Sequence, residues 1–335
     1  MSVSVTSLAR GRVRALCGRG LDAETFRREL RARLHAVLPF DAYCVNTADP
    51  ASLAITSSVG DGLSAEEASL LFAIEARGLD ANRLCDLARA GTPVATIGPR
   101  SERSERMRAL FLPRGWVDEL RAALVERGRC WGYLHLFRAT LFTRADVTSV
   151  AKLVPALALA LRVGVRPRVA TPPQAPEPLP GVLVFSRTGQ IVAQTRAAAE
   201  ALSTIPRDAH HGGPPHAIVD VARTSLARGG AAESHVVTGA GVLRLVATTE
   251  AECAVVVLER ARPGAAMQLA LACHRLSRRE EDVCRAMLRG LSDDEIAANL
   301  GVGTQTVKSH AKALFAKLEV VGRRGLLAKM AAVAP

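Results

Sequence analysis

Apolar residues recur at helical intervals near the C-terminal end of the chain. After Thr304 they fall at Val307, Ala311, Leu314 and Leu318, with spacings of four, three and four residues. This spacing places the four side chains along one side of a helix. The pattern therefore predicts an amphipathic helix with one continuous buried face.

Two shorter helices are predicted before this one by repeated start signals. Ser277 precedes Glu280 by three residues, and Ser292 precedes Glu295 by the same interval, which is the spacing of a capping box. A glycine follows each helical pattern, as is common at helix ends. Only the short stretch 301–303 separates the second helix from the third, so the pair has the layout of a helix-turn-helix.

The region 1–165 contains apolar patterns of both kinds, those of helices and those of strands. Runs with helical spacing alternate with short apolar runs that are typical of strands. Thr143 and Asp146 repeat the capping-box spacing, with Asp in place of Glu. Such a mixture predicts an α+β fold. The expected helices are 23–38, 64–76, 101–112 and 144–163, and the expected strands are 42–47, 53–58, 118–125 and 130–137.

A proline-rich segment ends this first region. Residues 166–180 hold six of the 17 prolines, cannot sustain a helix, and are predicted to form a semi-rigid linker. Beyond it, 181–262 has the pattern of two strands joined by a turn, then helices, then three strands, which is again α+β. The expected elements there include a helix at 217–227 and strands at 234–238, 242–248 and 253–259. The predicted architecture is multidomain, with α+β domains at 1–165 and 181–262 and an all-α domain at 270–335.

Composition and charge add a candidate partner. With 335 residues, 49% apolar and 23% charged, the chain can form two or three folded domains. Its net charge of +12 and its pI near 10.1 favour a polyanionic partner. Lysine supplies only five of the 44 basic residues, yet Lys308, Lys312 and Lys317 all lie in the third predicted C-terminal helix. Lys308 and Lys312 are one turn apart beside Ser309, and Gln305 is one turn earlier, which predicts a cationic, hydrogen-bonding face.

The sequence gives little indication of a metal site, a cofactor site or a catalytic site. His210, His211 and His216 could hold a metal or haem, but a Gly/Pro-rich loop with solvent-exposed histidines is the favoured interpretation, so no metal or cofactor is expected. The seven cysteines form no C-x-x-C pair and are expected to be free thiols in a reducing compartment. No G-x-S-x-G, P-loop or H-E-x-x-H motif occurs, so no catalytic residue is expected. The chain lacks an 18-residue apolar run and a signal peptide, which predicts a cytoplasmic protein.

The C-terminal sequence LSRREEDVCRAMLRGLSDDEIAANLGVGTQTVKSHAKALFAKLEV resembles the LuxR-type helix-turn-helix family of bacterial transcription regulators. The shared motifs are L-S-x-R-E, G-L-S-x-x-E-I-A-x-x-L, T-V-K-x-H and K-L. The resemblance implies a tetrahelical domain whose fourth helix, around 324–332, is commonly used for dimer contact. The sequence departs from the family at Gly303-Thr304, where Ser-Pro is common. By this resemblance, Lys308, Ser309 and Lys312 face base edges, Thr304, Thr306, His310 and Lys317 lie near the phosphate backbone, and Gln305 is also on the DNA-binding helix.

The two earlier regions resemble sensor modules. The helix leading to PFDAYCV, the strand pair VDELRAALVERGRCWGYLHLFR and the closing helix FTRADVTSVAKLVPALALALR are together similar to a GAF domain. The hairpin and helix GVLVFSRTGQIVAQTRAAAEAL, with the three strands after them, resemble a PAS domain. These resemblances imply sensory domains, but no ligand-contacting residue can be matched, so the ligand is unknown. Two empty dimerisation scaffolds are an equally open interpretation.

Together these features predict a one-component, sequence-specific DNA-binding regulator. Its sensory domains would control a homodimeric helix-turn-helix that reads the major groove of double-stranded DNA, with RNA polymerase as a candidate further partner. The first 60 residues lack the acidic pocket of a phosphorylated receiver. Two Trp and two Tyr are too few for the aromatic pocket of an acyl-homoserine-lactone receptor. The alternative is a protein-interaction regulator whose helix-turn-helix does not bind DNA directly.

Overall fold

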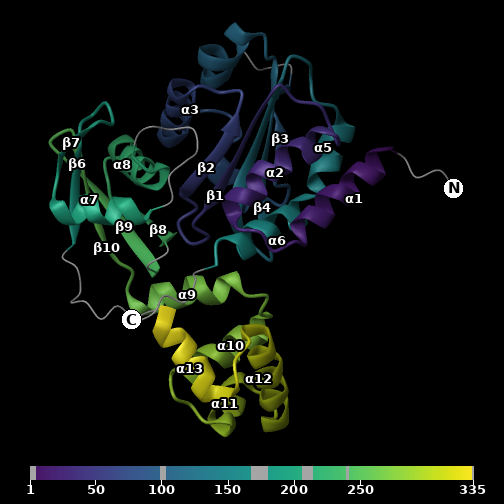
Figure 1. The fold of residues 1–335 in the computed structure, drawn as a ribbon, viewed down its shortest axis with the longest axis vertical. Helices are drawn as coiled ribbons and strands as arrows, with labels where there is room; N and C mark the ends of the chain where they lie inside the picture. Colours follow the sequence, from purple (N-terminus) through teal and green to yellow (C-terminus); the bar gives the residue numbers. More distant parts are fainter. Residues whose placement is uncertain (1–4, 99–102, 167–179, 206–213, 239–240, 334–335) are drawn as a thin grey trace. The chain divides into compact units, whose positions relative to one another are not determined.

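The computed structural model describes residues 5–98, 103–166, 180–205, 214–238 and 241–333 (Figure 1). The N-terminal and central domains belong to one compact unit, and the helices that follow Arg260 belong to a second. The predicted linker falls almost entirely outside the described residues. The same is true of His210 and His211.

The N-terminal domain is an α+β fold, as predicted from the mixed hydrophobic periods. Three elements were missed by sequence reasoning: the first helix, the short helix α4 and the short strand β3. Its elements are α1 (Val5–Cys17), α2 (Ala23–His35), β1 (Ala42–Ala48), β2 (Ile55–Asp61), α3 (Ala65–Arg77), α4 (Leu84–Arg89), β3 (Val94–Thr96), β4 (Asp118–Glu126), β5 (Arg129–Arg138), α5 (Arg144–Ala151) and α6 (Val154–Gly164).

Two predicted helices differ from the structure. The described part of the predicted helix 101–112 contains a π-helical turn, Met107–Phe111, in place of a regular α-helix, and a 3-10 turn, Leu112–Arg114, follows it. Pro113 lies in that second turn and has no N–H to continue an α-helix. The predicted helix 144–163 is divided into α5 and α6 for the same reason, because Pro155 occupies the first turn of α6.

Within the described residues, no single helix is long and apolar enough to cross a membrane. The helices α5 and α6 reach that length and apolarity only when they are taken together across a bend of 41°.

The N-terminal sheet is antiparallel, with the strand order β2-β1-β5-β4-β3. Helices α1, α2 and α6 pack together over one face, while α3 and α4 contribute to the core on the other (Figure 1). Gly132 in β5 permits the close approach on the α6 side. A Cβ atom there would lie 2.0 Å from the carbonyl oxygen of Asn46 and 2.6 Å from Cδ1 of Leu161.

A charged network fills part of the interior between this sheet and α3. Glu119 is fully buried in β4. Its carboxylate accepts hydrogen bonds from Nε of Arg106 at 2.6 Å and from Nε of Arg121 at 2.7 Å. Arg121 also donates from Nη1 to Glu75 of α3 at 2.6 Å, and Nδ1 of His135 lies 3.3 Å from Glu119. Burial alone would raise the pKa of Glu119, but Arg106 and Arg121 hold that pKa well below its ordinary value.

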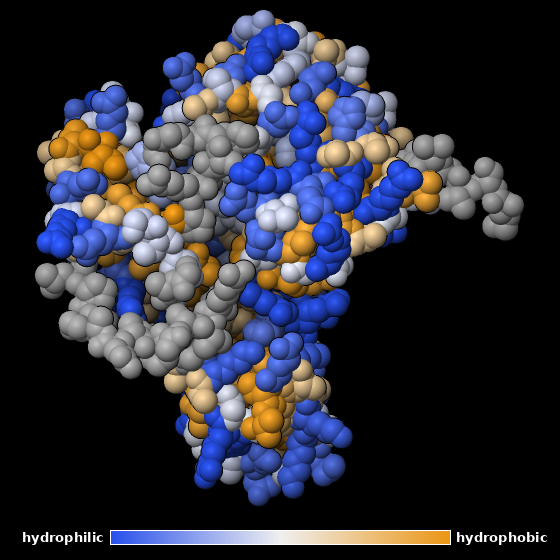
Figure 2. All heavy atoms as spheres, in the orientation of Figure 1, coloured by the Kyte–Doolittle hydropathy of each residue, from blue (hydrophilic) through white to orange (hydrophobic). Residues whose placement is uncertain are grey.

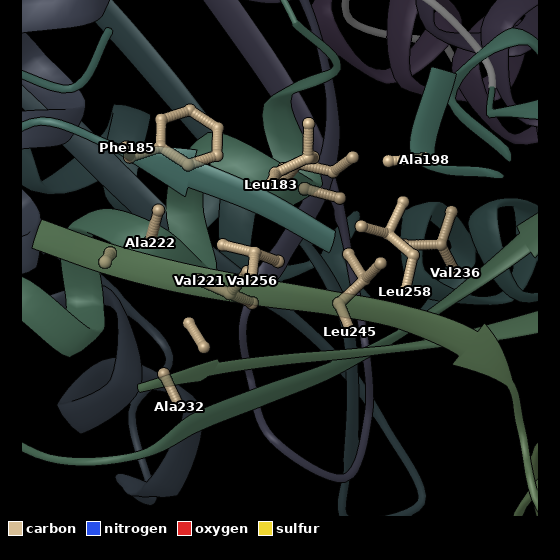
Figure 3. Packing of buried hydrophobic residues seen from close by; sticks show 14 of the residues in the cluster. Leu183, Phe185, Ala198, Val221, Ala222, Ala232, Val236, Leu245, Val256 and Leu258 are labelled. Carbon is tan, nitrogen blue, oxygen red and sulfur yellow. The ribbon is translucent and has the colours of Figure 1, made fainter. Parts of the chain in front are cut away.

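The central domain is a second α+β unit with an antiparallel strand order of β7-β6-β10-β9-β8. Its core is apolar: Leu183 and Phe185 of β6 and Val256 of β10 face Val221 and Ala222 of α8 (Figure 3). The predicted helix and the three predicted strands are confirmed. The elements are β6 (Gly181–Phe185), β7 (Ile191–Gln194), α7 (Arg196–Thr204), α8 (His216–Arg228), β8 (Ala232–Thr238), β9 (Gly241–Glu250) and β10 (Cys253–Arg260).

Helix α8 and strand β8 join the central domain to the N-terminal domain. Arg223 donates to the carbonyl oxygen and the Oγ of Ser69, at 2.9 and 2.6 Å. The backbone N–H of His235 donates to Oδ2 of Asp49 at 2.9 Å. His216, which was expected in a solvent-exposed loop, instead begins α8 and is buried, with its ring 4.0 Å from that of Phe72. That expectation was wrong for His216 because Phe72, on α3 of the N-terminal domain, packs against its ring.

The C-terminal unit is all-α, as predicted. Its helices share a core formed by buried apolar residues that include Val283, Met287, Ile296 and Leu326. The helix that precedes the predicted tetrahelical unit was not expected from the sequence. The elements are α9 (Pro263–Cys273), α10 (Arg278–Leu288), α11 (Asp293–Leu300), α12 (Thr304–Leu318) and α13 (Gly322–Val333).

Candidate nucleic-acid interface

Local sequence signals fix the ends of the helices that form the helix-turn-helix. Ser277 and Glu280 form a reciprocal capping box at α10, and Ser292 and Glu295 form another at α11. Both boxes satisfy backbone groups that a helix end would otherwise leave without partners. Gly301 then ends α11 with a φ of +63°, a left-handed conformation that glycine adopts at little cost. The chain therefore turns sharply into α12.

Helix α12 is anchored by the predicted apolar stripe. Val307, Ala311, Leu314 and Leu318 are all buried and belong to the C-terminal core. Burying an aliphatic side chain contributes roughly 1.5–3 kcal/mol, so this stripe fixes which face of α12 remains outside.

The outward face of α12 carries the predicted DNA-binding residues. Within the described part of the chain, the side chains of Lys308 and Lys312 have no hydrogen-bond or ion-pair partner. Their ammonium groups are therefore available to an external anion. The exposed residues are Gln305, Thr306, Lys308, Ser309, Lys312 and Lys317, and the half-buried ones are Thr304 and His310.

Two hydroxyl groups on this helix are already engaged. Thr304 donates from Oγ1 to Oδ1 of Asp294 at 2.7 Å, which ties the start of α12 to α11. Ser309 donates from Oγ to the carbonyl oxygen of Gln305 at 3.0 Å, as serine commonly does within a helix. The N-cap of α12, Gly303, makes no side-chain capping bond.

Lys317 lies in a different setting from the other two lysines. Its Nζ is 2.7 Å from both carboxylate oxygens of Glu280, the residue that closes the α10 capping box. Although burial raises the pKa of Glu280, the bonds from Lys317 and Ser277 outweigh it and the pKa is lowered. The ammonium of Lys317 thus links α12 to α10, and its contact with a phosphate stays a prediction.

Arg323, at the start of α13, was missed by sequence reasoning. Its Nη1 donates to the carbonyl oxygen of Leu291, and its Nη2 lies 3.0 Å from Oδ1 of Asp293. Together with Lys308 and Lys312, Arg323 borders a hollow of about 400 Å³ beside α12. The only available signal was an arginine next to the predicted fourth helix, because its partners lie 30 or more residues earlier.

Residues 274–330 match the family model of bacterial regulatory proteins of the luxR family. A protein of Aeromonas salmonicida named as an HTH-type transcriptional regulator is 48% identical over 52 residues, which cover 16% of this chain and 26% of that protein. The uncharacterized transcriptional regulatory protein YhcZ of Bacillus subtilis is 48% identical over 50 residues, or 15% of this chain and 23% of YhcZ. The C-terminal domain is therefore a LuxR-type helix-turn-helix domain, as its motifs predicted. The match spans about a quarter of the length of these curated relatives.

Among solved structures, Escherichia coli SdiA aligns with 97% of this chain and 96% of its own, at 13% identity and a TM-score of 0.36.

Proposed function

We propose that the protein is a sequence-specific DNA-binding transcriptional regulator whose α12 enters the major groove. The observation that carries this proposal is the division of α12 into a buried apolar stripe and an exposed polar face with two unpaired lysines in the described chain. A recognition helix needs both features, because one face must be fixed to the domain while the other approaches the bases.

The residue roles follow from position on this face. Lys308, Ser309 and Lys312 would approach base edges, where a lysine donates to O6 and N7 of guanine. The remaining residues of this surface would lie at or near the phosphate backbone, where they set affinity and register more than sequence preference. These are Thr304, Thr306, His310 and Lys317, while Gln305 lies one turn before Lys308 on the same face.

Homodimerisation through α13 completes the proposal. On this helix and the turn before it, Leu327 is 44% exposed and Val321 is 93% exposed, so apolar surface is available for a second copy. Figure 2 shows apolar residues among hydrophilic ones on the visible face of the C-terminal domain. Two copies related by a twofold axis would place two recognition helices on half-sites about one helical turn apart.

The wider organisation belongs to the same proposal. The segments 1–165 and 181–262 would act as GAF-like and PAS-like sensory domains, 166–180 as their linker and 270–335 as the DNA-binding domain. The protein would act in the cytoplasm, where it would meet DNA and RNA polymerase.

The experiment is to measure binding of the full-length protein to genomic DNA fragments across a salt series. Wild type should enrich particular fragments and lose affinity steeply as salt rises, because phosphate contacts release counterions. The double variant Lys308→Ala/Lys312→Ala should lose its fragment preference and about 1–3 kcal/mol per lysine on the preferred site.

A charge-matched control separates base reading from net charge. The double variant Arg187→Ala/Arg196→Ala also removes two positive charges, from side chains of the central domain that are 75% and 93% exposed. It should keep the wild-type preference. Equal binding by the lysine variant and wild type would refute the recognition-helix assignment, and no DNA binding by wild type would favour the protein-interaction alternative.

A further inference from the structure

A cavity of about 260 Å³ lies where the N-terminal and central domains meet within their common compact unit. Its N-terminal wall comes from the β1–β2 turn, the end of α3, the start of α4 and one residue of β5. Its central wall comes from α8 and the start of β8. The apolar part of the lining includes Leu53, Ile55, Ala76, Leu84, Val221 and Ala232.

Two of the three carboxylates in the lining are already neutralised. Glu75 accepts from the backbone N–H of Leu84 at 2.8 Å and from Arg121 at 2.6 Å. Glu233 receives two hydrogen bonds from Arg244, each 3.0 Å long. Neither carboxylate therefore needs a further cation.

Asp220, on α8, is the third carboxylate and is different. Its Oδ2 accepts one hydrogen bond, from the backbone N–H of Ile55 across the domain boundary, at 3.2 Å. Its Oδ1 has no hydrogen-bond partner among the described residues. Burial and the nearby Glu75 raise the pKa of Asp220 to about 7, even though the bond from Ile55 favours the ionised form. The cavity therefore contains a carboxylate that accepts a single hydrogen bond and lies next to apolar walls.

The two arginines in the lining do not supply the missing positive partner. The guanidinium of Arg83 lies 3.4 Å from Sγ of Cys85 and 3.6 Å from Asp86. Arg228 is exposed at the end of α8 and forms no hydrogen bond with Asp220 in the described structure. Arg223 and Arg228 favour the ionised Asp220 through their charge, but neither donates a hydrogen bond to it in the described structure. A cation brought by a ligand would supply that direct partner.

We propose that this cavity binds a small organic amine, with the ammonium group on Asp220 and the short hydrocarbon part against Leu53, Ala76 and Val221. The volume lies below the usual range of roughly 300–1,000 Å³ for ligand pockets, so the ligand has only a few heavy atoms. Because the walls come from two domains, the bound amine stabilises their docked arrangement. The inference goes beyond the proposed function and does not depend on DNA binding.

The first test is thermal unfolding of the full-length protein at pH 8 with a series of primary n-alkylamines from ethylamine to pentylamine. The expected result is a saturable rise in the melting temperature for at least one amine and no rise with the alcohol of the same chain length. No rise with any amine, or an equal rise with the alcohol, would overturn the proposal.

Matched variants locate the site. Asp220→Asn should abolish the amine-dependent rise, whereas Asp61→Asn, at the exposed end of β2, should retain it. A rise that persists in Asp220→Asn would contradict the assignment of the ammonium to this carboxylate.

A cavity-filling variant tests the location without removing a charge. Thr224→Phe adds a ring to the α8 wall and should abolish the rise while the circular dichroism spectrum is retained. Because Asp220 has a pKa of about 7, wild-type affinity should also fall as the pH is lowered from 8 to 6. Unchanged amine binding in Thr224→Phe, or binding that does not weaken at pH 6, would count against the site.

Discussion

The N-terminal and central domains share a strand order but differ in their interiors. In each sheet, the strands run second, first, fifth, fourth, third across the sheet. The fourth strand of the N-terminal sheet buries Glu119 and Arg121, whereas the fourth strand of the central sheet buries Leu245 and Ala247. The same topology therefore encloses an ionic network in one domain and an apolar core in the other.

The difference shows that strand order does not determine the chemistry of a core. An apolar core stabilises the fold in proportion to the apolar area that it buries. It also tolerates replacement of one hydrophobic side chain by another of similar volume. A buried charge is tolerated only where its partners are complete, because desolvation costs several kcal/mol per ion. The N-terminal domain should accordingly be the less tolerant of single charge removals.

The largest expected effect is that of Glu119→Gln. The amide keeps the shape but leaves Arg106 and Arg121 buried without their shared counter-charge, so we expect a loss of about 3–5 kcal/mol. Urea unfolding followed by tryptophan fluorescence measures it, because Trp116 and Trp131 both lie in the N-terminal domain.

The exposed pair of Glu24 with Arg28 provides the control. Its two charged groups are 2.7 Å apart, and their side chains are about half exposed. Glu24→Gln should cost no more than about 0.5 kcal/mol. If Glu119→Gln lowered the free energy of unfolding as little as Glu24→Gln does, the buried network would not contribute to stability.

The contrast between these cores could be predicted only in part. Strands β4 and β5 were predicted to within one residue at each end, because their apolar runs and the turn between them are clear. The burial of Glu119 and Arg121 was not predicted, since charged residues in a strand normally face solvent. Their partners Glu75 and Arg106 lie on other elements, and only the folded chain brings them together.

The second effect concerns the apolar core of the central domain. Leu183→Ala would leave a cavity between β6 and α8, and we expect a loss of about 3 kcal/mol. Urea unfolding followed by far-ultraviolet circular dichroism measures it, since the central domain has no tryptophan. A loss below about 1 kcal/mol would mean that the core closes around the gap, contrary to the packing in Figure 3.

The third effect lies where the two domains meet. Because the folded-state pKa of Asp220 is raised to about 7, its contribution is favourable at low pH and is lost as the pH rises through 7. Between pH 5 and 8 this carboxyl should cost wild type about 2 kcal/mol, a cost that Asp220→Asn removes.

The measurement is the difference in unfolding free energy between wild type and Asp220→Asn at several pH values. The difference is needed because buried His135 has a lowered pKa and acts in the opposite direction, favouring the folded state as the pH rises. A difference that does not change between pH 5 and 8 would contradict the raised pKa of Asp220.

The candidate DNA interface was more predictable than either the N-terminal or the central domain. The capping boxes and the stripe through Val307 and Leu314 are local signals, and the structure has both. The bond from Lys317 to Glu280 was not predictable, because 37 residues separate the two positions. Local sequence signals thus identified the helices and their faces, while the pairing of individual charges required the tertiary structure.

The smallest expected effect completes the comparison between the two domains. The central domain also carries an exposed ion pair: Arg187 and Glu252 are 2.7 Å apart, with side chains 75% and 72% exposed. Arg187→Ala should therefore change the unfolding free energy by no more than about 0.5 kcal/mol. Arg121→Ala, which removes an arginine from the buried network, should cost several kcal/mol under the same urea conditions. If the two arginine variants were equally stable, the interiors would not differ in the way that their burial and ion pairs indicate.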